Sequence, residues 1–393
     1  MKKIAKQALI LITIFGIVSL LGDIIYEGAR GINGQYLQIL GASAAVIGFF
    51  TGLGEFFGYG LRAISGYISD KTKSYWFLTI LGYALLAFVP LLALAGNWQL
   101  AITFIIFERI GKAIRSPARD TILSYSAKKV GTGWGFGIHE FLDQIGALLG
   151  PLLISIVFLQ FKTISLKEYQ YAYSILFIPF LVLILFLIFA YFFFKNSKFE
   201  VEEKRKKEKF SRVFWIYIAF TFATTLGLIS FAILGYHFKV KNVIPEAQIP
   251  LLYSFAMITD ALAALAIGKA YDKLEKKSSG LLLLILIPLL TLLIPVLVFF
   301  ENFVFILLGI AFFGMVLGFH ETIMRAAIAD ITPISKRGSG YGIFTALYGL
   351  ASLAGGALVG IFYEISISFL TVFVFLTQIF AIAIFFFLKR RIS

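Results

Sequence analysis

The sequence predicts an all-α membrane protein made of two six-helix bundles that are related by pseudo-two-fold symmetry. Three observations predict this fold class. The composition is that of a chain dissolved in lipid, the apolar residues form twelve long runs, and landmarks of the first six runs recur in the last six. Helices are the expected elements because each one satisfies its own backbone polar groups inside a bilayer.

The composition excludes a soluble globular protein. Of the 393 residues, 60% are hydrophobic and only 14% are charged, and the mean hydropathy is +0.93. A soluble domain cannot hide that much apolar surface from water. The sequence contains no cysteine, so disulfides and thiolate metal sites are also excluded.

Twelve apolar runs divide the chain, and each comes near the roughly 20 residues that a helix needs to cross a bilayer. Their approximate limits are 7–30, 43–68, 76–96, 98–124, 134–160, 170–194, 212–238, 248–271, 279–300, 302–331, 338–363 and 367–388. Lysine and arginine gather on alternate connections, which predicts that both termini lie on the cytoplasmic side of the cell membrane. The formal net charge of +14 is therefore a topology signal that favours contact with membrane lipid, and we expect no nucleic-acid partner.

The two halves of the chain carry the same landmarks in the same order. The matching segments are 66–71 with 268–273, 115–120 with 325–330 (both Arg-x4-Asp), and 133–138 with 338–343. An internal repeat of membrane spans is typical of secondary transporters. The charged segment 196–211 interrupts the apolar chain, which predicts a cytoplasmic linker between an N-terminal bundle, 1–195, and a C-terminal bundle, 212–393.

Two motifs carry a resemblance to a known family. They are a loop motif at Gly66, Asp70 and Lys71, and a fifth-span antiporter motif at Gly137, Gly146, Gly150 and Pro151. With twelve spans divided six and six, the chain resembles the major facilitator superfamily over nearly its whole length. Within that family it is similar to the drug–proton antiporters, in a less-characterised subgroup. Ile154 and Ser155 replace the glycine pair that follows the antiporter motif in those relatives.

The resemblance implies a secondary active transporter in which two bundles expose a central site alternately to each side of the membrane. It further implies proton-coupled export of a small amphipathic or organic-ion solute, a proton gradient in place of any cofactor, and a monomer. Enzyme motifs such as the phosphate-binding loop are missing, so we expect no enzymatic activity. Two alternatives stay open: a proton- or ion-coupled importer of a small organic anion, and a non-transporting membrane protein such as a scramblase or scaffold.

Charged residues within the apolar runs are the candidates for function, because each costs roughly 2.5–3.5 kcal/mol at the centre of a spanning helix. In the first run, Asp23, Glu27 and Arg30 follow helical spacing and form one stripe. One base can pair with only one of the two acids, which leaves a carboxylate free to carry a proton. Asp23 and Glu27 are therefore candidate proton carriers, and Arg30 is a candidate cavity residue. The alternative is a static ion pair. Glu55, in the second run, is a further cavity candidate.

The fourth run is the most charged. Arg109 and Lys112 are candidate contacts for a substrate, although they are equally suited to pair with acids on neighbouring helices. Charges near the predicted cytoplasmic ends of the helices favour a gate that closes in one state and opens in the other. The predicted gate residues are Asp70, Arg115, Arg119 and Asp120 in the first half and Asp272, Arg325 and Asp330 in the second.

The fifth run supplies two more acids. Glu140 and Asp143 are candidate proton carriers, with a packed and paired acid as the alternative. His139 and Asp143 share a helical face, but two ligands do not make a metal site, and we expect none. Gly137, Gly146, Gly150 and Pro151 are more typical of close helix packing than of chemistry. In the second half, Asp260 is the remaining cavity candidate.

Overall fold

The computed structural model describes residues 2–127, 129–195, 210–275, 280–333 and 336–392. Most of the predicted linker, 196–211, therefore lies outside the described residues. Within the described part of the chain, all regular structure is helical, and this confirms the predicted all-α fold class.

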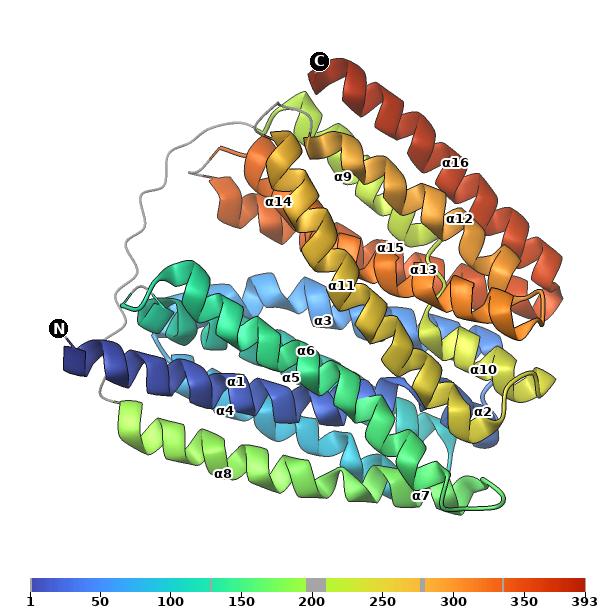
Figure 1. The fold of residues 1–393 in the computed structure, drawn as a ribbon, viewed down its shortest axis with the longest axis horizontal. Helices are drawn as coiled ribbons and strands as arrows, with labels where there is room; N and C mark the ends of the chain where they lie inside the picture. The colour runs from blue at the N-terminus through green and yellow to red at the C-terminus, as the bar shows by residue number, and fades with distance from the viewer. Residues whose placement is uncertain (1, 128, 196–209, 276–279, 334–335, 393) are drawn as a thin grey trace. The chain divides into compact units, whose positions relative to one another are not determined.

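The described residues of the first half form eight α-helices and two 3-10 helices. They are α1 (Lys2–Arg30), α2 (Asn33–Ile39), α3 (Ala44–Thr72), α4 (Tyr75–Ala84), η1 (Leu85–Phe88), η2 (Pro90–Leu94), α5 (Trp98–Ala127), α6 (Thr132–Phe158), α7 (Leu166–Ile175) and α8 (Phe177–Phe194). Figure 1 shows α1, α4, α5, α6 and α8 as neighbouring helices.

The described residues of the second half also form eight α-helices and two 3-10 helices. Its elements are α9 (Arg212–Leu226), α10 (Phe231–Lys241), η3 (Glu246–Gln248), α11 (Ile249–Glu275), η4 (Gly280–Ile285), α12 (Leu286–Val298), α13 (Phe303–Glu321), α14 (Ile323–Ile331), α15 (Arg337–Ile365) and α16 (Ile367–Ile392). Several elements that follow one another form one span, as α9 with α10 and α13 with α14 do.

Eleven segments of the described chain are long and apolar enough to cross a membrane, whereas the sequence predicts twelve spans. The difference is α5, which is 30 residues long and also has the length of a spanning helix. The charged residues of α5 lower its mean hydropathy. A stable position in the membrane therefore requires partners for those charges.

Several predicted continuous spans are broken in the structure. The run 76–96 passes from α4 into the tight turns η1 and η2 around Pro90, because proline cannot donate the backbone hydrogen bond of a regular helix. The run 302–331 breaks at Thr322, where α13 ends and α14 begins. Apolar periodicity does not reveal such breaks, because both sides of each break stay apolar.

The chain divides into two compact units. Unit 1 comprises 1–42, 57–202 and 246–254, and unit 2 comprises 43–56, 203–245 and 255–393. The units differ from the halves proposed from the sequence by two short segments: the first part of α3 belongs to unit 2, and η3 with the first turns of α11 belongs to unit 1. Each of these two long helices therefore passes from one unit to the other.

The centre of unit 1 is the packing of α1 against α6, which glycines bring close together. A Cβ atom added at Gly146 would lie 2.3 Å from the carbonyl oxygen of Leu20, and one at Gly150 would lie 2.5 Å from that of Ile24. A Cβ atom at Gly137 would meet nothing within 4 Å. Of the glycines predicted to pack closely, Gly146 and Gly150 therefore lie at the contact between α1 and α6, and Gly137 does not.

Unit 2 contains an equivalent close approach between the first part of α3 and α15. An added Cβ atom at Gly48 would lie 2.2 Å from the carbonyl oxygen of Gly356, and one at Gly52 would lie 2.5 Å from that of Ser352. α9 packs against both α15 and α16. Small residues allow such contacts between backbones, which is how helices associate in lipid.

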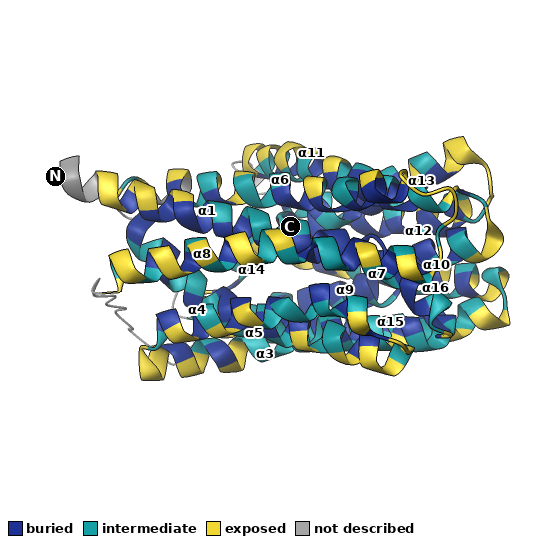
Figure 2. Cartoon of the chain, turned by 90° about the horizontal axis from the view of Figure 1, so that it is seen from below, coloured by how far each residue is buried: buried dark blue, intermediate teal, exposed yellow. Residues whose placement is uncertain are grey.

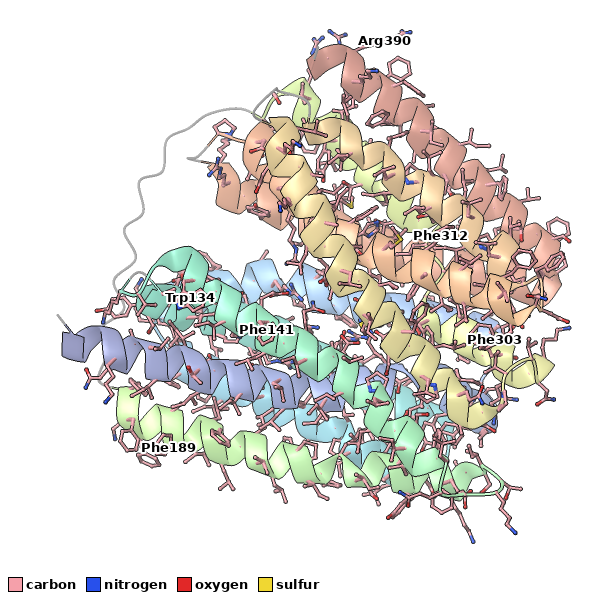
Figure 3. All side chains as sticks on the ribbon, viewed as in Figure 1. Trp134, Phe141, Phe189, Phe303, Phe312 and Arg390 are labelled. Atoms are coloured by element: carbon pink, nitrogen blue, oxygen red, sulfur yellow. The ribbon has the colours of Figure 1, made fainter. Side chains whose placement is uncertain are left out.

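The outer surface of the helices is apolar, as expected for a chain in lipid. In α8 the buried residues Leu183, Leu187 and Ala190 form a single stripe, and the rest of the helix is largely exposed. Figure 2 shows exposed residues recurring along α8, and Figure 3 shows the exposed ring of Phe189 projecting from it.

We predict that Gly150→Ala lowers the apparent free energy of unfolding in detergent by about 1–3 kcal/mol, because its Cβ atom would collide with the backbone of α1. Gly137→Ala is the matched control on the same helix, and it should be neutral or stabilising by up to about 1 kcal/mol. Titration with sodium dodecyl sulfate, followed by circular dichroism, measures both. Equal losses for the two variants would contradict this account of α1–α6 packing.

Candidate functional site

A network of charged and polar side chains lies between α1, α5 and α6 of unit 1. These three helices pack against one another in pairs. They carry most of the charged residues that the sequence singles out, and the structure places them within a single compact unit.

Tyr26 of α1 is the hub of the network, and its side chain is buried. Three cations surround its ring: Arg30 Cζ lies 5.1 Å, Arg109 Cζ 4.6 Å and Lys112 Nζ 3.9 Å from the ring centre. The guanidinium of Arg109 also donates a hydrogen bond to the Tyr26 hydroxyl. Cation–π contacts strengthen when the cation is desolvated, so Tyr26 provides a favourable environment for charge inside the bundle.

Glu27 is the most fully buried of the predicted proton carriers, with 7% of its surface exposed. Its Oε2 accepts a hydrogen bond of 2.6 Å from the hydroxyl of Tyr253, and its Oε1 lies 3.6 Å from Nη1 of Arg30. Tyr253 lies in the first turns of α11, which belong to unit 1. One carboxylate therefore connects helices that are more than 200 residues apart in the sequence.

Other hydrogen bonds hold the same end of α11 to unit 1. Tyr169 donates to Glu246 Oε1 (2.5 Å), and Ser254 donates to the carbonyl oxygen of Leu148 (3.2 Å). Ser155 donates to the carbonyl oxygen of Ala247 (2.5 Å). Ser155 thus holds η3, directly before α11.

Asp23 lies one helical turn before Glu27 and is half-buried. Two acids, Asp143 and Glu27, and two bases, Lys112 and Arg115, act on it electrostatically. The predicted stripe of Asp23 and Glu27 on α1 thus faces charges from both α5 and α6. A change of protonation at any of these acids alters the balance of the whole group.

A second chain of contacts links the same three helices through Asp143. The Ser19 hydroxyl of α1 donates to Asp143 of α6, and Arg119 Nη1 of α5 lies 3.3 Å from the Ser19 oxygen, to which it donates. Arg119 also lies 2.8 Å from the carboxylate of Asp120. Glu140 is exposed and accepts a hydrogen bond from the amide of Gln144 at 3.5 Å.

The predicted gate residues have other partners in this structure. Arg115 is buried, with Nη2 3.9 Å from Glu108 Oε1 and Nη1 3.4 Å from the carbonyl oxygen of Gly82. Asp70 is exposed and accepts from the Tyr75 hydroxyl at 3.3 Å. A gate in which Asp70 pairs with Arg115 or Arg119 therefore stays a prediction, and it would require these contacts to exchange.

The candidates of the second half lie in unit 2. Asp260 of α11 is buried beside Gly318 of α13. Asp330 accepts a hydrogen bond of 2.6 Å from Tyr271, the residue before Asp272, and both Asp330 and Arg325 act electrostatically on Tyr341. Asp272 and Arg325 are exposed. Glu55 is half-buried in the part of α3 that belongs to unit 2. Among the described residues, no three histidine, aspartate or glutamate side chains are grouped so that they could hold a metal ion.

Sequence reasoning missed three members of this site: Tyr26, Tyr253 and Ser19. Tyr26 and Ser19 lie on the same stripe of α1 as Asp23 and Arg30, so extending the search from charged to hydroxyl-bearing residues finds both. Tyr253 gives no such signal, because nothing in an apolar run of the second half indicates contact with the first helix.

The arrangement defines a class of protein: a multi-pass helical membrane protein with a charged network inside its first unit. A family model described as Major Facilitator Superfamily matches residues 9–324 and again 213–392. The chain belongs to this superfamily of secondary transporters. The second match covers the C-terminal copy of the internal repeat.

Relatives extend over nearly the whole chain. An uncharacterised protein of Mycobacterium tuberculosis is 36% identical over 95% of this chain and 92% of its own length. An uncharacterised transporter of the same superfamily from Methanocaldococcus jannaschii is 27% identical, over 90% and 88%. A mutant of the nucleoside transporter NupG has a similar structure, with a TM-score of 0.76, 15% identity, and coverage of 97% of this chain and 99% of that one. At this identity the structural likeness shows the fold alone.

We predict that Tyr26→Phe destabilises the protein by about 1.5–3 kcal/mol, because the buried guanidinium of Arg109 loses the hydroxyl that accepts its hydrogen bond. Tyr26→Leu should cost roughly 1–2 kcal/mol more, since the aromatic ring contacted by the three cations is lost as well. Unfolding titration in detergent measures both. Tyr67→Leu is the control, because Tyr67 is exposed and only Lys71 approaches its ring, at 6.0 Å. Stability unchanged in both Tyr26 variants would show that Tyr26 is not the hub.

Proposed function

We propose that this protein is a proton-coupled secondary active transporter that exports a small amphipathic or organic-ion solute by alternating access. The observation that carries the proposal is the position of Glu27, which is buried among charged side chains and hydrogen-bonded to Tyr253 where α11 passes between the units. A proton gradient supplies the energy, and no cofactor takes part.

Protonation of Glu27 changes both of its contacts. The ion pair with Arg30 loses its charge, and the hydrogen bond from Tyr253 to a carboxylate becomes a neutral one, which is roughly half as strong. Tyr253 is followed within two residues by the part of α11 that belongs to unit 2. A proton on Glu27 therefore weakens the attachment of α11 to unit 1, and that is the coupling step we propose.

We rank the predicted proton carriers by burial and charged neighbours. Glu27 comes first because it is buried, and Asp23 and Asp143 follow, because they interact electrostatically with each other, Asp23 also with Lys112 and Arg115, and Asp143 also with Arg119. Glu140 comes last, because it is exposed. Export, rather than import, follows from the resemblance of the fifth span to the antiporter motif. The same proposal places both termini on the cytoplasmic side of the cell membrane.

A second candidate function is import of a small organic anion, driven by protons or another ion. The specific observation that favours it is the arrangement of Arg30, Arg109 and Lys112 around the ring of Tyr26. Three cations that converge on one side chain would attract a carboxylate or phosphate group of a substrate. Their acidic neighbours Glu27 and Glu108 would then exchange partners with it.

The proton-coupling proposal predicts that Glu27→Gln abolishes solute-driven proton movement while solute exchange across the membrane persists, since glutamine keeps the size of the side chain and cannot release a proton. A panel of lipophilic cations, organic anions and sugars is added to proteoliposomes that contain a pH-sensitive dye. The sign of the pH change gives the direction of transport. Glu140→Gln is the matched control and should retain proton movement.

Tyr253→Phe should slow coupled transport by roughly tenfold, because a hydrogen bond to a charged group contributes about 1.5–3 kcal/mol. Tyr169→Phe is the matched control: it removes the hydroxyl bound to Glu246 at the same end of α11 and leaves Glu27 untouched. Proton movement that survives Glu27→Gln, Asp23→Asn and Asp143→Asn would contradict proton coupling through the network.

The importer alternative predicts a different result for Lys112→Gln. Uptake of the responding anion should show a KM raised about tenfold or more with little change in the maximal rate, because a charge that binds the substrate is lost. Radiolabelled uptake measures both constants. If transport of cations and anions falls equally, Lys112 supports the network and does not bind substrate.

A further inference from the structure

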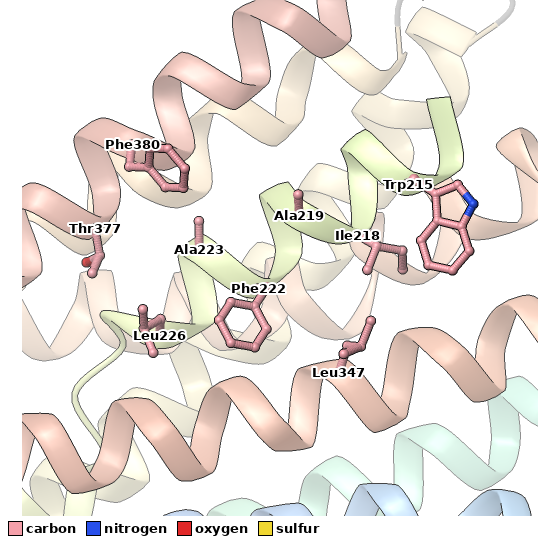
Figure 4. Close-up of a pocket in the computed structure, with 9 residues that line it drawn as sticks. All are labelled: Trp215, Ile218, Ala219, Phe222, Ala223, Leu226, Leu347, Thr377 and Phe380. Atoms are coloured by element: carbon pink, nitrogen blue, oxygen red, sulfur yellow. The ribbon is translucent and has the colours of Figure 1, made fainter. Parts of the chain in front are cut away.

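Unit 2 contains an apolar groove that the transport proposal does not use. It lies between α9, α15 and α16, and its volume is about 420 Å³ (Figure 4). Its lining includes Trp215, Ala219, Leu226, Thr377 and Phe380. Trp215 is 51% and Phe380 is 63% exposed, so the groove opens on the outer surface of the unit.

One end of the groove is basic. On α9, Arg212 lies three residues before Trp215 and continues the helical face of Trp215 and Ala219. On α16, Arg391 lies eleven residues after Phe380, three helical turns along the same face. Both arginines are exposed.

The register between the two helices places these arginines at the same level. Gln378 of α16 donates a hydrogen bond of 3.0 Å to the carbonyl oxygen of Thr224 of α9, and the rings of Phe220 and Phe385 lie 6.3 Å apart. The helices therefore run antiparallel. Counting twelve residues outward from each member of the Thr224–Gln378 pair reaches Arg212 on one helix and residue 390 on the other.

Two further observations put positive charge at the Trp215 end. Arg390 lies at the end of α16 in Figure 3 and is exposed. Lys336 Nζ lies 4.6 Å from the ring centre of Phe210, and that ring lies 6.3 Å from the ring of Trp215. Arg212, Lys336, Arg390 and Arg391, from three parts of unit 2, thus form a basic rim at one end of the groove.

The length of the groove matches one leaflet of a bilayer. From Trp215 to Leu226, eleven residues of helix at 1.5 Å each extend about 16 Å, close to half of the roughly 30 Å hydrocarbon core. Trp215 lies at one end of the groove and Leu226 with Thr377 toward the other, as Figure 4 shows. Tryptophan at the charged end agrees with its preference for the membrane–water interface.

We propose that the groove binds one phospholipid with an anionic headgroup, whose phosphate contacts the basic rim and whose acyl chain lies along Trp215, Ala219 and Phe380. The apolar lining fits an acyl chain and offers almost no partner to a polar solute. The rim explains why the headgroup is anionic, because each lysine or arginine near a membrane surface favours anionic lipid. This site is separate from the charged network of unit 1, so it does not depend on the direction or coupling of transport.

The test measures quenching of Trp215 by brominated lipids. In a variant with Trp76, Trp98 and Trp134 replaced by phenylalanine, Trp215 is the only tryptophan left. The protein is reconstituted in phosphatidylcholine vesicles with increasing fractions of brominated phosphatidylglycerol or brominated phosphatidylcholine. We expect quenching at a lower fraction of the glycerol lipid. Equal quenching by both lipids would overturn the proposal, because it indicates ordinary lipid contact only.

Two substitutions separate the headgroup from the acyl chain. Arg212→Gln with Arg391→Gln should reduce the preference for phosphatidylglycerol about fivefold for each charge removed, while Lys71→Gln with Lys73→Gln, on unit 1, should leave it unchanged. Ala219→Phe fills the groove and should weaken quenching by both lipids, whereas Leu185→Phe, at an exposed site on α8, should not. A preference that survives the loss of both arginines would also overturn the proposal.

If the single-tryptophan variant fails to fold, native mass spectrometry of the unmodified chain decides the same question. One phosphatidylglycerol molecule retained in preference to phosphatidylcholine, and lost in Arg212→Gln with Arg391→Gln, supports the site. Retention of neither lipid, or of both equally, contradicts it. Retention of several anionic lipids that is insensitive to these arginines indicates non-specific adsorption and contradicts it as well.

Discussion

The structure depends on how charge is satisfied inside a membrane-spanning bundle. α5 carries six charged residues, Glu108, Arg109, Lys112, Arg115, Arg119 and Asp120, each of which would cost roughly 2.5–3.5 kcal/mol if it stood alone at the centre of a spanning helix. In unit 1 these charges meet carboxylates, carbonyl oxygens and the rings of Tyr26 and Tyr83. Glu108 and Asp120 of α5 itself pair with its arginines, while α1 and α4 provide the rings of Tyr26 and Tyr83, the Ser19 hydroxyl and the carbonyl oxygen of Gly82. These partners stabilise α5 in the membrane.

The close packing of the helices makes this pairing geometrically possible. Gly146 and Gly150 bring α6 onto α1 at backbone contact, which sets Asp143 beside Ser19 and leaves Glu27 within reach of Tyr253. Larger residues at either glycine would separate the helices by ångströms, and charge pairing weakens steeply over that range once water enters. The pairing of charges in unit 1 therefore depends on the close packing of α6 against α1.

The two helices that pass between the units are attached in chemically different ways. The first part of α3 is attached to α15 through Gly48 and Gly52, where backbones pack together, and by a hydrogen bond of 2.9 Å from the backbone amide of Ala45 to the exposed carboxylate of Glu364. η3 and the first turns of α11 are attached to unit 1 through side-chain hydrogen bonds, one of which ends on the buried Glu27. The internal repeat makes α3 and α11 equivalent in topology, but the carboxylate that holds α3 is exposed and the one that holds α11 is buried.

The sequence by itself determined the membrane environment, the helical fold class, the approximate spans and the stripe of Asp23, Glu27 and Arg30, because composition and helical spacing are local properties. It did not reveal the breaks at Pro90 and Thr322 as interruptions of spans, since apolar residues continue across them. Only the tertiary structure decided the partners from different helices: Arg109 and Lys112 at the ring of Tyr26, and Tyr253 on Glu27. The physical reason is that a buried charge selects its partner by distance in the packed bundle, and residues from different spans acquire that distance only when the helices have packed.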